Sequence, residues 1–128
     1  MSKHETPMTR AYWKKVGGTL VEEFPVVRRT STNGARYLDA IILPNGENRI
    51  AHWEDIEVEG QDVIVVQTKA KRLGMYLLGQ AVFSAGLIKR FNPSSVRSIA
   101  LCRRGDSVLE ELLHEYPEVE VVAMAAED

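Results

Sequence analysis

The segment 62–69, which reads DVIVVQTK, constrains the fold more than any other part of the chain. Its four consecutive β-branched residues favour an extended strand, and the run shows no alternation of apolar and polar positions. An uninterrupted apolar strand of this kind is typical of a sheet covered on both faces. The segment therefore predicts a buried strand, which the rest of the chain has to surround.

Apolar runs and the residues that break them predict the remaining elements. Pro25 lies inside the first strand, which favours an edge position or a bulge there. Asn33-Gly34 indicates a turn, so the first two strands form a hairpin. Ser107 and Glu110 have the spacing of a capping box at the start of the last helix. We expect helices over 6–16, 75–91 and 107–116 and further strands over 19–28, 35–43, 96–102 and 119–124, with 47–61 either one helical turn or an irregular excursion.

The resulting order is helix, strand, strand, strand, helix, strand, helix, strand. The alternation in the second half requires crossover connections between strands. The sequence therefore predicts an α/β fold with a mixed central sheet flanked by helices. We expect one domain over 1–128, with loose tails at 1–8 and 125–128.

Charge and composition exclude several classes of protein. Lys and Arg number 16 and Asp and Glu 18, a net charge of −2, which excludes a wholly basic nucleic-acid coat but not a local basic patch. The single cysteine, Cys102, cannot form an internal disulfide and is expected in the core. No secretory or membrane-spanning pattern is present, because 1–10 is polar and Gly79, Gln80 and Ser84 interrupt the longest apolar segment. We expect a cytoplasmic protein without a membrane partner.

Three polar residues interrupt strands that are otherwise apolar. Asp39 lies in the strand 35–43, and Gln67 and Lys69 follow the apolar run of 62–69 on one face. If the two strands are neighbours, Asp39 lies beside Gln67 and Lys69, which would create a site for a hard cation with an adjacent ammonium group. The alternative is a structural ion pair between Asp39 and Lys69, which would offset the cost of a carboxylate in an apolar strand.

In the order of its elements and in these residues, the chain resembles the PD-(D/E)XK nuclease superfamily. That family carries an aspartate on the second strand and Glu/Asp-x-Lys on the third, with a helix directly after it. The matching positions here are Asp39, Gln67-Thr68-Lys69 and the helix expected over 74–91, and the resemblance extends from Tyr12 to Met124. Gln67 replaces the usual acidic residue, and in this the chain is similar to the Mrr-like restriction endonuclease branch.

The resemblance implies a restriction-endonuclease-like core and metal-dependent hydrolysis of DNA. Asp39, Gln67 and Lys69 would be the catalytic residues, with Asp39 and Gln67 as ligands of Mg²⁺ or Mn²⁺ and Lys69 beside the phosphate or the attacking water. The glutamine removes one negative charge from the cation site. Glu22 or Glu23 could restore it, but strand alternation allows only one of them to face the site. The acidic stretch formed by Glu54, Asp55, Glu57 and Glu59 is either another source or a solvated surface.

Binding of DNA requires further polar and basic groups around the site. Lys71, Arg72 and Gln80 are the candidate substrate-binding residues. Cleavage of both strands would favour a homodimer, and Gly79 and Gly86 would permit close packing of their helix on the sheet or on a partner helix. No set of stacking aromatic residues is evident in the sequence. Arg28, Arg29, Arg36, Arg103 and Arg104 could rim a groove for phosphates or be ordinary surface residues.

Two other functions remain open from the sequence. One is a catalytically inactive module of the nuclease fold that mediates DNA or protein interaction, which the glutamine at position 67 and the slightly negative charge favour. The other is a structural α/β domain without a ligand. Metal-induced stabilisation would distinguish a cation site from either of these, because only a bound ligand raises the stability of the folded state.

Overall fold

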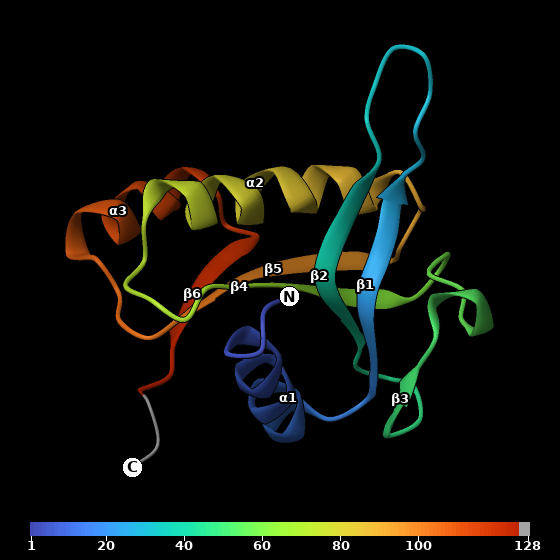
Figure 1. Ribbon diagram of the computed structural model, residues 1–128, viewed down its shortest axis with the longest axis horizontal. Coiled ribbons are helices and arrows are strands. Elements are labelled where there is room, and N and C mark those ends of the chain that lie inside the picture. The colour runs from blue at the N-terminus through green and yellow to red at the C-terminus, as the bar shows by residue number, and fades with distance from the viewer. Residues whose placement is uncertain (126–128) are drawn as a thin grey trace.

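A six-stranded mixed sheet with helices on both faces forms the core of the computed structural model, which describes residues 1–125 (Figure 1). The strand order is β3-β1-β2-β4-β5-β6. This architecture confirms the predicted α/β fold with a mixed central sheet. The strands are β1 (Thr19–Val27), β2 (Arg36–Leu43), β3 (Arg49–Ala51), β4 (Asp62–Thr68), β5 (Ser95–Cys102) and β6 (Val119–Ala123). The helices are α1 (Glu5–Val16), α2 (Met75–Lys89) and α3 (Ser107–Glu111), with short 3₁₀ helices η1 (Trp53–Asp55) and η2 (Leu112–Glu115).

The sheet has an antiparallel part and a parallel part that meet at β4. β1 pairs with β2, and β2 pairs with β4, both antiparallel, whereas β4, β5 and β6 are parallel neighbours. The register of β1 and β2 shifts between Pro25 and Val27, and β3 pairs only with Thr19 to Val21 of β1. Pro25 therefore lies at a bulge on an edge, as predicted, because its ring cannot donate a ladder hydrogen bond.

β4 is buried on both faces, which confirms the prediction from its β-branched run. Val63 and Val65 pack in a core cluster that includes Ile88 of α2. Ile64 and Val66 pack in a second cluster on the other face, together with Met8 and Tyr12 of α1. The alternation of side chains along the strand thus places α2 and α1 on opposite faces of the sheet.

The expectation of a buried helix after β4 is correct for only one side of α2. Leu77, Ala81 and Ile88 face the sheet and are buried. Met75, Tyr76 and Phe83 are exposed, although no charged residue separates them. The helix therefore lacks the polar outer face that is usual for a helix packed on a sheet.

The N-terminal tail expected over 1–8 is wrong in its second half. α1 begins at Glu5, and Met8 is buried in the core. The carbonyl of Ser2 accepts hydrogen bonds from the Glu5 and Thr6 amides, at 3.1 and 3.0 Å, and so starts the helix before Pro7. The C-terminal tail expected over 125–128 lies outside the described residues except for Ala125.

Two further elements differ from the prediction. The uncertain segment 47–61 contains both β3 and η1, so it extends the sheet beyond β1 and then forms one helical turn. The last helix is capped by Asp106 rather than Ser107: the Asp106 carboxylate accepts from the Val108 and Leu109 amides, both at 3.0 Å. Glu110 in turn accepts from the Asp106 amide at 2.9 Å. The reciprocal capping interaction is present, and its first residue precedes the predicted one.

Within residues 1–125, no helix is both long and apolar enough to cross a membrane. Cys102 is buried and free, as expected for a small core residue.

Asp62 joins the starts of two strands, and this predicts a pH-dependent contribution to stability. Its carboxylate accepts from the Ser95 hydroxyl at 2.6 Å and from the Asn45 side-chain amide at 3.0 Å, which lowers the pKa of Asp62. A lowered pKa stabilises the fold above the unfolded-state value, and the contribution is lost as the pH falls through the folded-state value. Asp62→Ala should therefore reduce the urea midpoint at neutral pH and much less in acid. An equal loss at both pH values would contradict this origin.

Candidate functional site

The predicted site lies where β2 and β4 separate. Backbone pairing runs from Ile42 opposite Ile64 to Ala40 opposite Val66. At the next position side chains replace the ladder: the Asp39 amide donates to Gln67 Oε1 at 3.0 Å. The Thr68 amide donates to Asp39 Oδ2 at 2.9 Å. The structure therefore brings Asp39 and Gln67 together, and each side chain satisfies a backbone group of the opposite strand.

β1 is distorted at the same level of the sheet. Its pairing with β2 is regular at Glu22 opposite Ala40 and at Phe24 opposite Leu38. Glu23, between them, has a φ of 53°, in the left-handed region that favours glycine. A non-glycine residue held there costs of order 1–3 kcal/mol, and such strain concentrates at functional sites. The distortion lies beside Asp39 and is a second local sign of a site.

Burial dominates the electrostatics of Asp39. It raises the pKa of the carboxyl group, and the Glu23 and Glu5 carboxylates raise it further. The hydrogen bond from the Thr68 amide and the charge of the Met1 amino group act in the opposite direction. Glu23 is thus the acidic residue of β1 that acts on Asp39, whereas Glu22 receives two hydrogen bonds from Arg10, at 3.1 and 2.8 Å.

Gln67 connects the two strands with α2. Its side chain is 4% exposed, and its Nε2 donates to Ser84 Oγ at 2.8 Å while its Oε1 accepts from Asp39. Both ends of the amide are therefore used, and no buried side-chain polar atom of the described residues lacks a partner. Gln67 and Gln80 line the same cavity of about 490 Å³ beside α2, so the two glutamines point into one space.

Lys69 follows β4 directly, but it does not pair with Asp39. Its Nζ lies 3.9 Å from Glu5 Oε2 and 5.8 Å from the centre of the Tyr76 ring. α1 brings Glu5 to this position, because Thr9, one turn further along, forms a 2.7 Å hydrogen bond with Thr68. The side chain of Lys69 is 43% exposed. Among residues 1–125 the predicted alternative of an Asp39–Lys69 ion pair is therefore not found.

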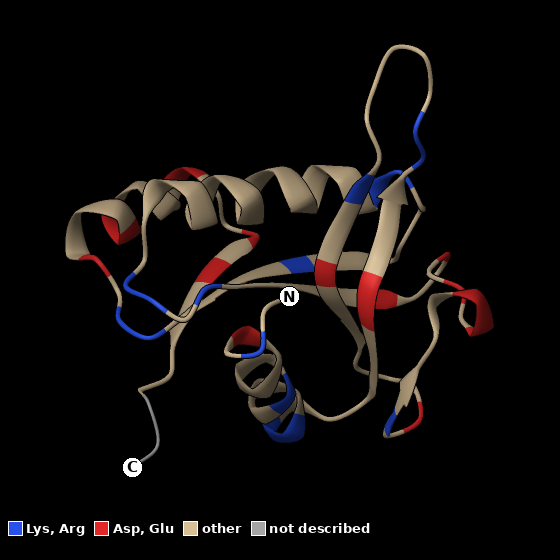
Figure 2. Ribbon diagram, viewed as in Figure 1, with Lys and Arg blue, Asp and Glu red and all other residues tan. Residues whose placement is uncertain are grey.

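The basic residues of the predicted site lie on two neighbouring loops, one between β4 and α2 and one between β5 and α3 (Figure 2). Lys69, Lys71 and Arg103 line a cavity of about 500 Å³ together with Glu5. Arg72 is exposed, and its backbone forms an isolated parallel β-bridge with the backbone of Arg104 on the second loop. The two loops thus form one basic edge beside Lys69, at the C-terminal ends of β4 and β5.

The oxygen ligands near Asp39 fit a divalent cation only if a substrate completes its coordination. Asp39 and Gln67 offer carboxylate and amide oxygens, which are the ligands of hard cations, whereas the Glu23 carboxylate forms an ion pair with the Met1 amino group. Within the described part of the chain, however, no group of three His, Cys, Asp or Glu residues is close enough to hold a metal ion. Mg²⁺ commonly binds through one or two carboxylates, waters and substrate phosphates, and the residues present fit that mode of binding.

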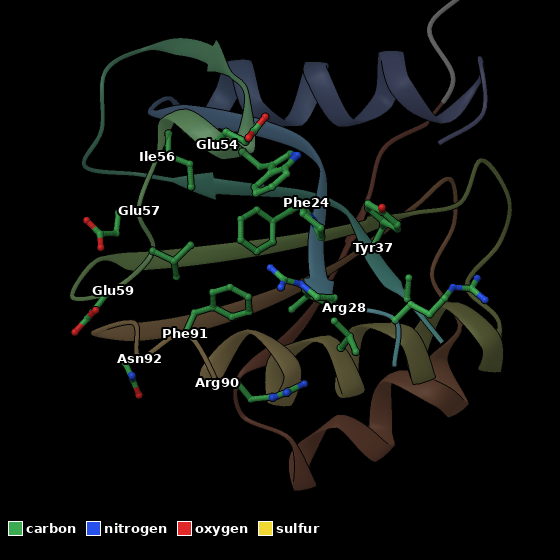
Figure 3. Close-up of a pocket in the computed structure, with 17 residues that line it drawn as sticks. Phe24, Arg28, Tyr37, Glu54, Ile56, Glu57, Glu59, Arg90, Phe91 and Asn92 are labelled. Atoms are coloured by element: carbon green, nitrogen blue, oxygen red, sulfur yellow. The ribbon is translucent and has the colours of Figure 1, made fainter. Parts of the chain in front are cut away.

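A third cavity, of about 920 Å³, was not predicted from the sequence (Figure 3). Four aromatic residues line it from separate elements: Phe24, Tyr37, Trp53 and Phe91. The rings of Phe24 and Phe91 meet edge to face, with centroids 5.4 Å apart. Their positions in the sequence have no common spacing, so only the fold brings them together. Arg28, Arg29 and Arg90 line the same cavity, as do Glu54, Glu57 and Glu59.

The acidic stretch 54–59 therefore does not supply further ligands to a cation bound at Asp39. Glu54, Asp55, Glu57 and Glu59 are exposed, and three of them line the aromatic cavity instead. Tyr37 lines both this cavity and the one that contains Gln67 and Gln80, so the two cavities adjoin.

The chain matches no protein-family model, and neither the curated proteins nor the solved structures that were searched gave a match.

Proposed function

We propose that this domain is a metal-dependent DNA nuclease of the PD-(D/E)XK type. The observation that carries the proposal is the position of Asp39 and Gln67 where β2 and β4 separate: the Asp39 amide donates to Gln67 Oε1 at 3.0 Å, and the Thr68 amide donates to the Asp39 carboxylate at 2.9 Å. Lys69 follows one position after the buried Thr68. A carboxylate, an amide oxygen and an ammonium group are thus carried by residues at one end of β4, and these are groups that can bind a cation and stabilise charge in phosphodiester hydrolysis.

Each residue has a distinct role in this mechanism. Asp39 and Gln67 would hold Mg²⁺ or Mn²⁺, which when bound polarises the scissile phosphate and lowers the pKa of a bound water. The Thr68 amide orients Asp39, and the Ser84 hydroxyl orients Gln67. Lys69 would neutralise charge that develops on the phosphate. Its contact with Glu5 is long and partly exposed, so exchanging it for a phosphate oxygen costs little.

The surroundings of this site offer contacts for DNA on two sides. Lys71 and Arg72 extend the basic edge beyond Lys69, where they would contact the phosphate backbone. Gln80 lies across the sheet in the cavity that contains Gln67. The adjoining aromatic cavity, with Trp53 and Tyr37 partly exposed, offers rings on which unpaired bases would stack. The substrate we propose is therefore DNA that is locally single-stranded near the scissile phosphate.

One observation favours a second function, a nuclease-fold module that binds DNA or protein without cleaving it. The Gln67 amide is satisfied at both ends by Asp39 and Ser84, and the chain supplies fewer than three clustered ligand side chains among residues 1–125. In that case Gln67 holds α2 on the sheet, and Asp39 only closes the gap between the strands.

Lys69→Ala distinguishes these two functions. We expect the rate of Mg²⁺- or Mn²⁺-dependent cleavage of plasmid and single-stranded DNA to fall by about 10²–10³-fold. This is the usual effect of removing one group that stabilises charge in the transition state. The urea midpoint should hardly change, because the side chain is 43% exposed and its ion pair is long. Lys14→Ala, which removes an exposed lysine of α1, is the matched control. A wild-type protein that binds DNA but does not cut it with either metal would leave only the second function.

A further inference from the structure

The outer face of α2 is apolar, exposed and free of charge. Met75, Tyr76 and Phe83 are 77, 73 and 74% exposed. No charged residue occurs from Met75 to Ile88, in a chain that is 27% charged. A helix that is apolar on all sides is normally buried on all sides, and loss of charged residues is the compositional mark of an interface core. This face therefore lacks a partner in the isolated chain.

Two glycines on the same face do not serve packing within the chain. A Cβ added at Gly79 or at Gly86 would meet no atom within 4 Å. Glycine in the interior of a helix costs about 1 kcal/mol relative to alanine, so each weakens α2 without an internal benefit. Packing of these glycines on the sheet, one of the two alternatives from the sequence, is therefore excluded. Close approach of a partner helix remains.

The large and small residues of this face form a single seam. Tyr76, Gly79, Phe83 and Gly86 follow one another at intervals of three, four and three residues. That spacing keeps a row of side chains on one side of a helix and suits packing against a second helix at a shallow angle. Along the seam a large aromatic residue alternates with a glycine, so each projection has a gap beside it.

We propose that two copies of this chain associate through α2, antiparallel across a two-fold axis. One register matches every large residue of the seam with a gap: Tyr76 faces Gly86 of the second copy, and Phe83 faces Gly79. The same register places Met75 opposite Leu87, because the residue numbers of each pair have the same sum. A two-fold interface must be self-complementary, and this face is its own complement. A helix from an unrelated partner would match these gaps only by coincidence.

The area of this face agrees with a stable dimer. An aromatic side chain offers about 150–250 Å² and Tyr76 and Phe83 are about three-quarters exposed, so together with Met75 they provide roughly 450 Å² per copy. Two copies would bury about 900 Å² through these three side chains alone, close to the 1,000 Å² or so of a specific interface. Leu87, which lines the cavity beside the seam, adds to this area. Lys89 and Arg90 lie outside the paired segment, since their counterparts precede Met75.

The first test fills the gaps. We expect the full chain to sediment as a dimer at micromolar concentration and Gly79→Leu/Gly86→Leu to sediment as a monomer, with the dimer dissociation constant raised by about 100-fold or more. The double variant should remain folded, with an unchanged far-UV circular dichroism spectrum, because the added side chains meet nothing in the monomer. Lys14→Leu, the same side chain on an exposed position of α1, is the control and should remain a dimer. A monomeric wild type, or a dimer that survives both leucines, would overturn the proposal.

The second test examines the register. Phe83→Lys and Gly79→Glu should each be monomeric alone. In a dimer of two identical variant chains, the new lysine would be buried against Gly79, and the new glutamate against Phe83, so neither charge would have a partner. Mixed together they should form a heterodimer, in which the lysine of one copy faces the glutamate of the other. If the mixture stays monomeric while the wild type is a dimer, the antiparallel register is wrong. Neither test measures cleavage, so both are independent of the proposed nuclease activity.

Discussion

Asp39→Asn is expected to abolish DNA cleavage and, at neutral pH, to raise the free energy of unfolding. The carboxylate would be a cation ligand, so its loss should reduce the rate by at least about 10³-fold. Burial raises the pKa of Asp39, which means that the folded protein disfavours the ionised form. Asparagine has no charge to bury, and its Oδ1 can still accept the hydrogen bond from the Thr68 amide.

The pH dependence of this gain gives a separate measurement. A raised pKa contributes stability that is fully present below the unfolded-state value of 3.8 and lost as the pH rises through the folded-state value. The advantage of Asp39→Asn should therefore appear over that interval and then stay constant towards neutral pH. Urea unfolding of wild type and variant at a series of pH values measures it. Asp55→Asn, which replaces an exposed carboxylate of η1 by the same amide, is the control for the substitution itself.

Two outcomes would count against this account of Asp39. A variant that still cuts DNA at the wild-type rate would remove Asp39 from the cation site. A variant that is less stable than the wild type at neutral pH would mean that the hydrogen bond from the Thr68 amide needs the full charge of the carboxylate. In that case Asp39 is primarily a structural link between β2 and β4.

Gln67→Glu is expected to weaken the fold without metal and to increase the stabilisation that Mg²⁺ produces. It adds a carboxylate at a position that is 4% exposed and next to Asp39, and like charges in a buried site raise each other's pKa and oppose folding. The hydrogen bonds remain possible, since the Asp39 amide still donates and the Ser84 hydroxyl can turn to donate. A divalent cation would relieve the repulsion, so the rise in Tm with Mg²⁺ should exceed that of the wild type.

Gln67→Leu is the matched variant, because it keeps a similar volume but removes both polar ends. It leaves the Asp39 amide and the Ser84 hydroxyl without their partners, at about 1–3 kcal/mol for each buried group that stays unsatisfied. It should respond weakly or not at all to Mg²⁺. Thermal unfolding of the three proteins with and without Mg²⁺ completes the experiment. Equal metal responses in Gln67→Glu and the wild type would contradict a cation site and favour the non-cleaving module.

Local sequence patterns were sufficient to predict the elements that contribute most of the hydrophobic core. The bounds of β4 and α2 follow from an apolar run and its flanking breakers, which act within a few residues. The three residues of β3 could not be predicted, because their extended form depends on pairing with Thr19 to Val21 of β1. The helix expected over 6–16 matches α1, but the loose tail expected over 1–8 did not allow for tertiary contacts: Met8 is ordered and buried because the sheet offers it a surface.

The sequence by itself determined that this chain forms an α/β fold with a strand buried on both faces, and that Asp39, Gln67 and Lys69 interrupt apolar strands. These features depend on residue type and on short spacing, which are local. Only the tertiary structure decided which contacts these polar residues make. It joined Gln67 to Ser84 and turned Lys69 toward Glu5 rather than Asp39. It also gathered the aromatic residues of β1, β2, η1 and the turn after α2 around one cavity, because strand pairing and helix packing bring together positions that no sequence interval relates.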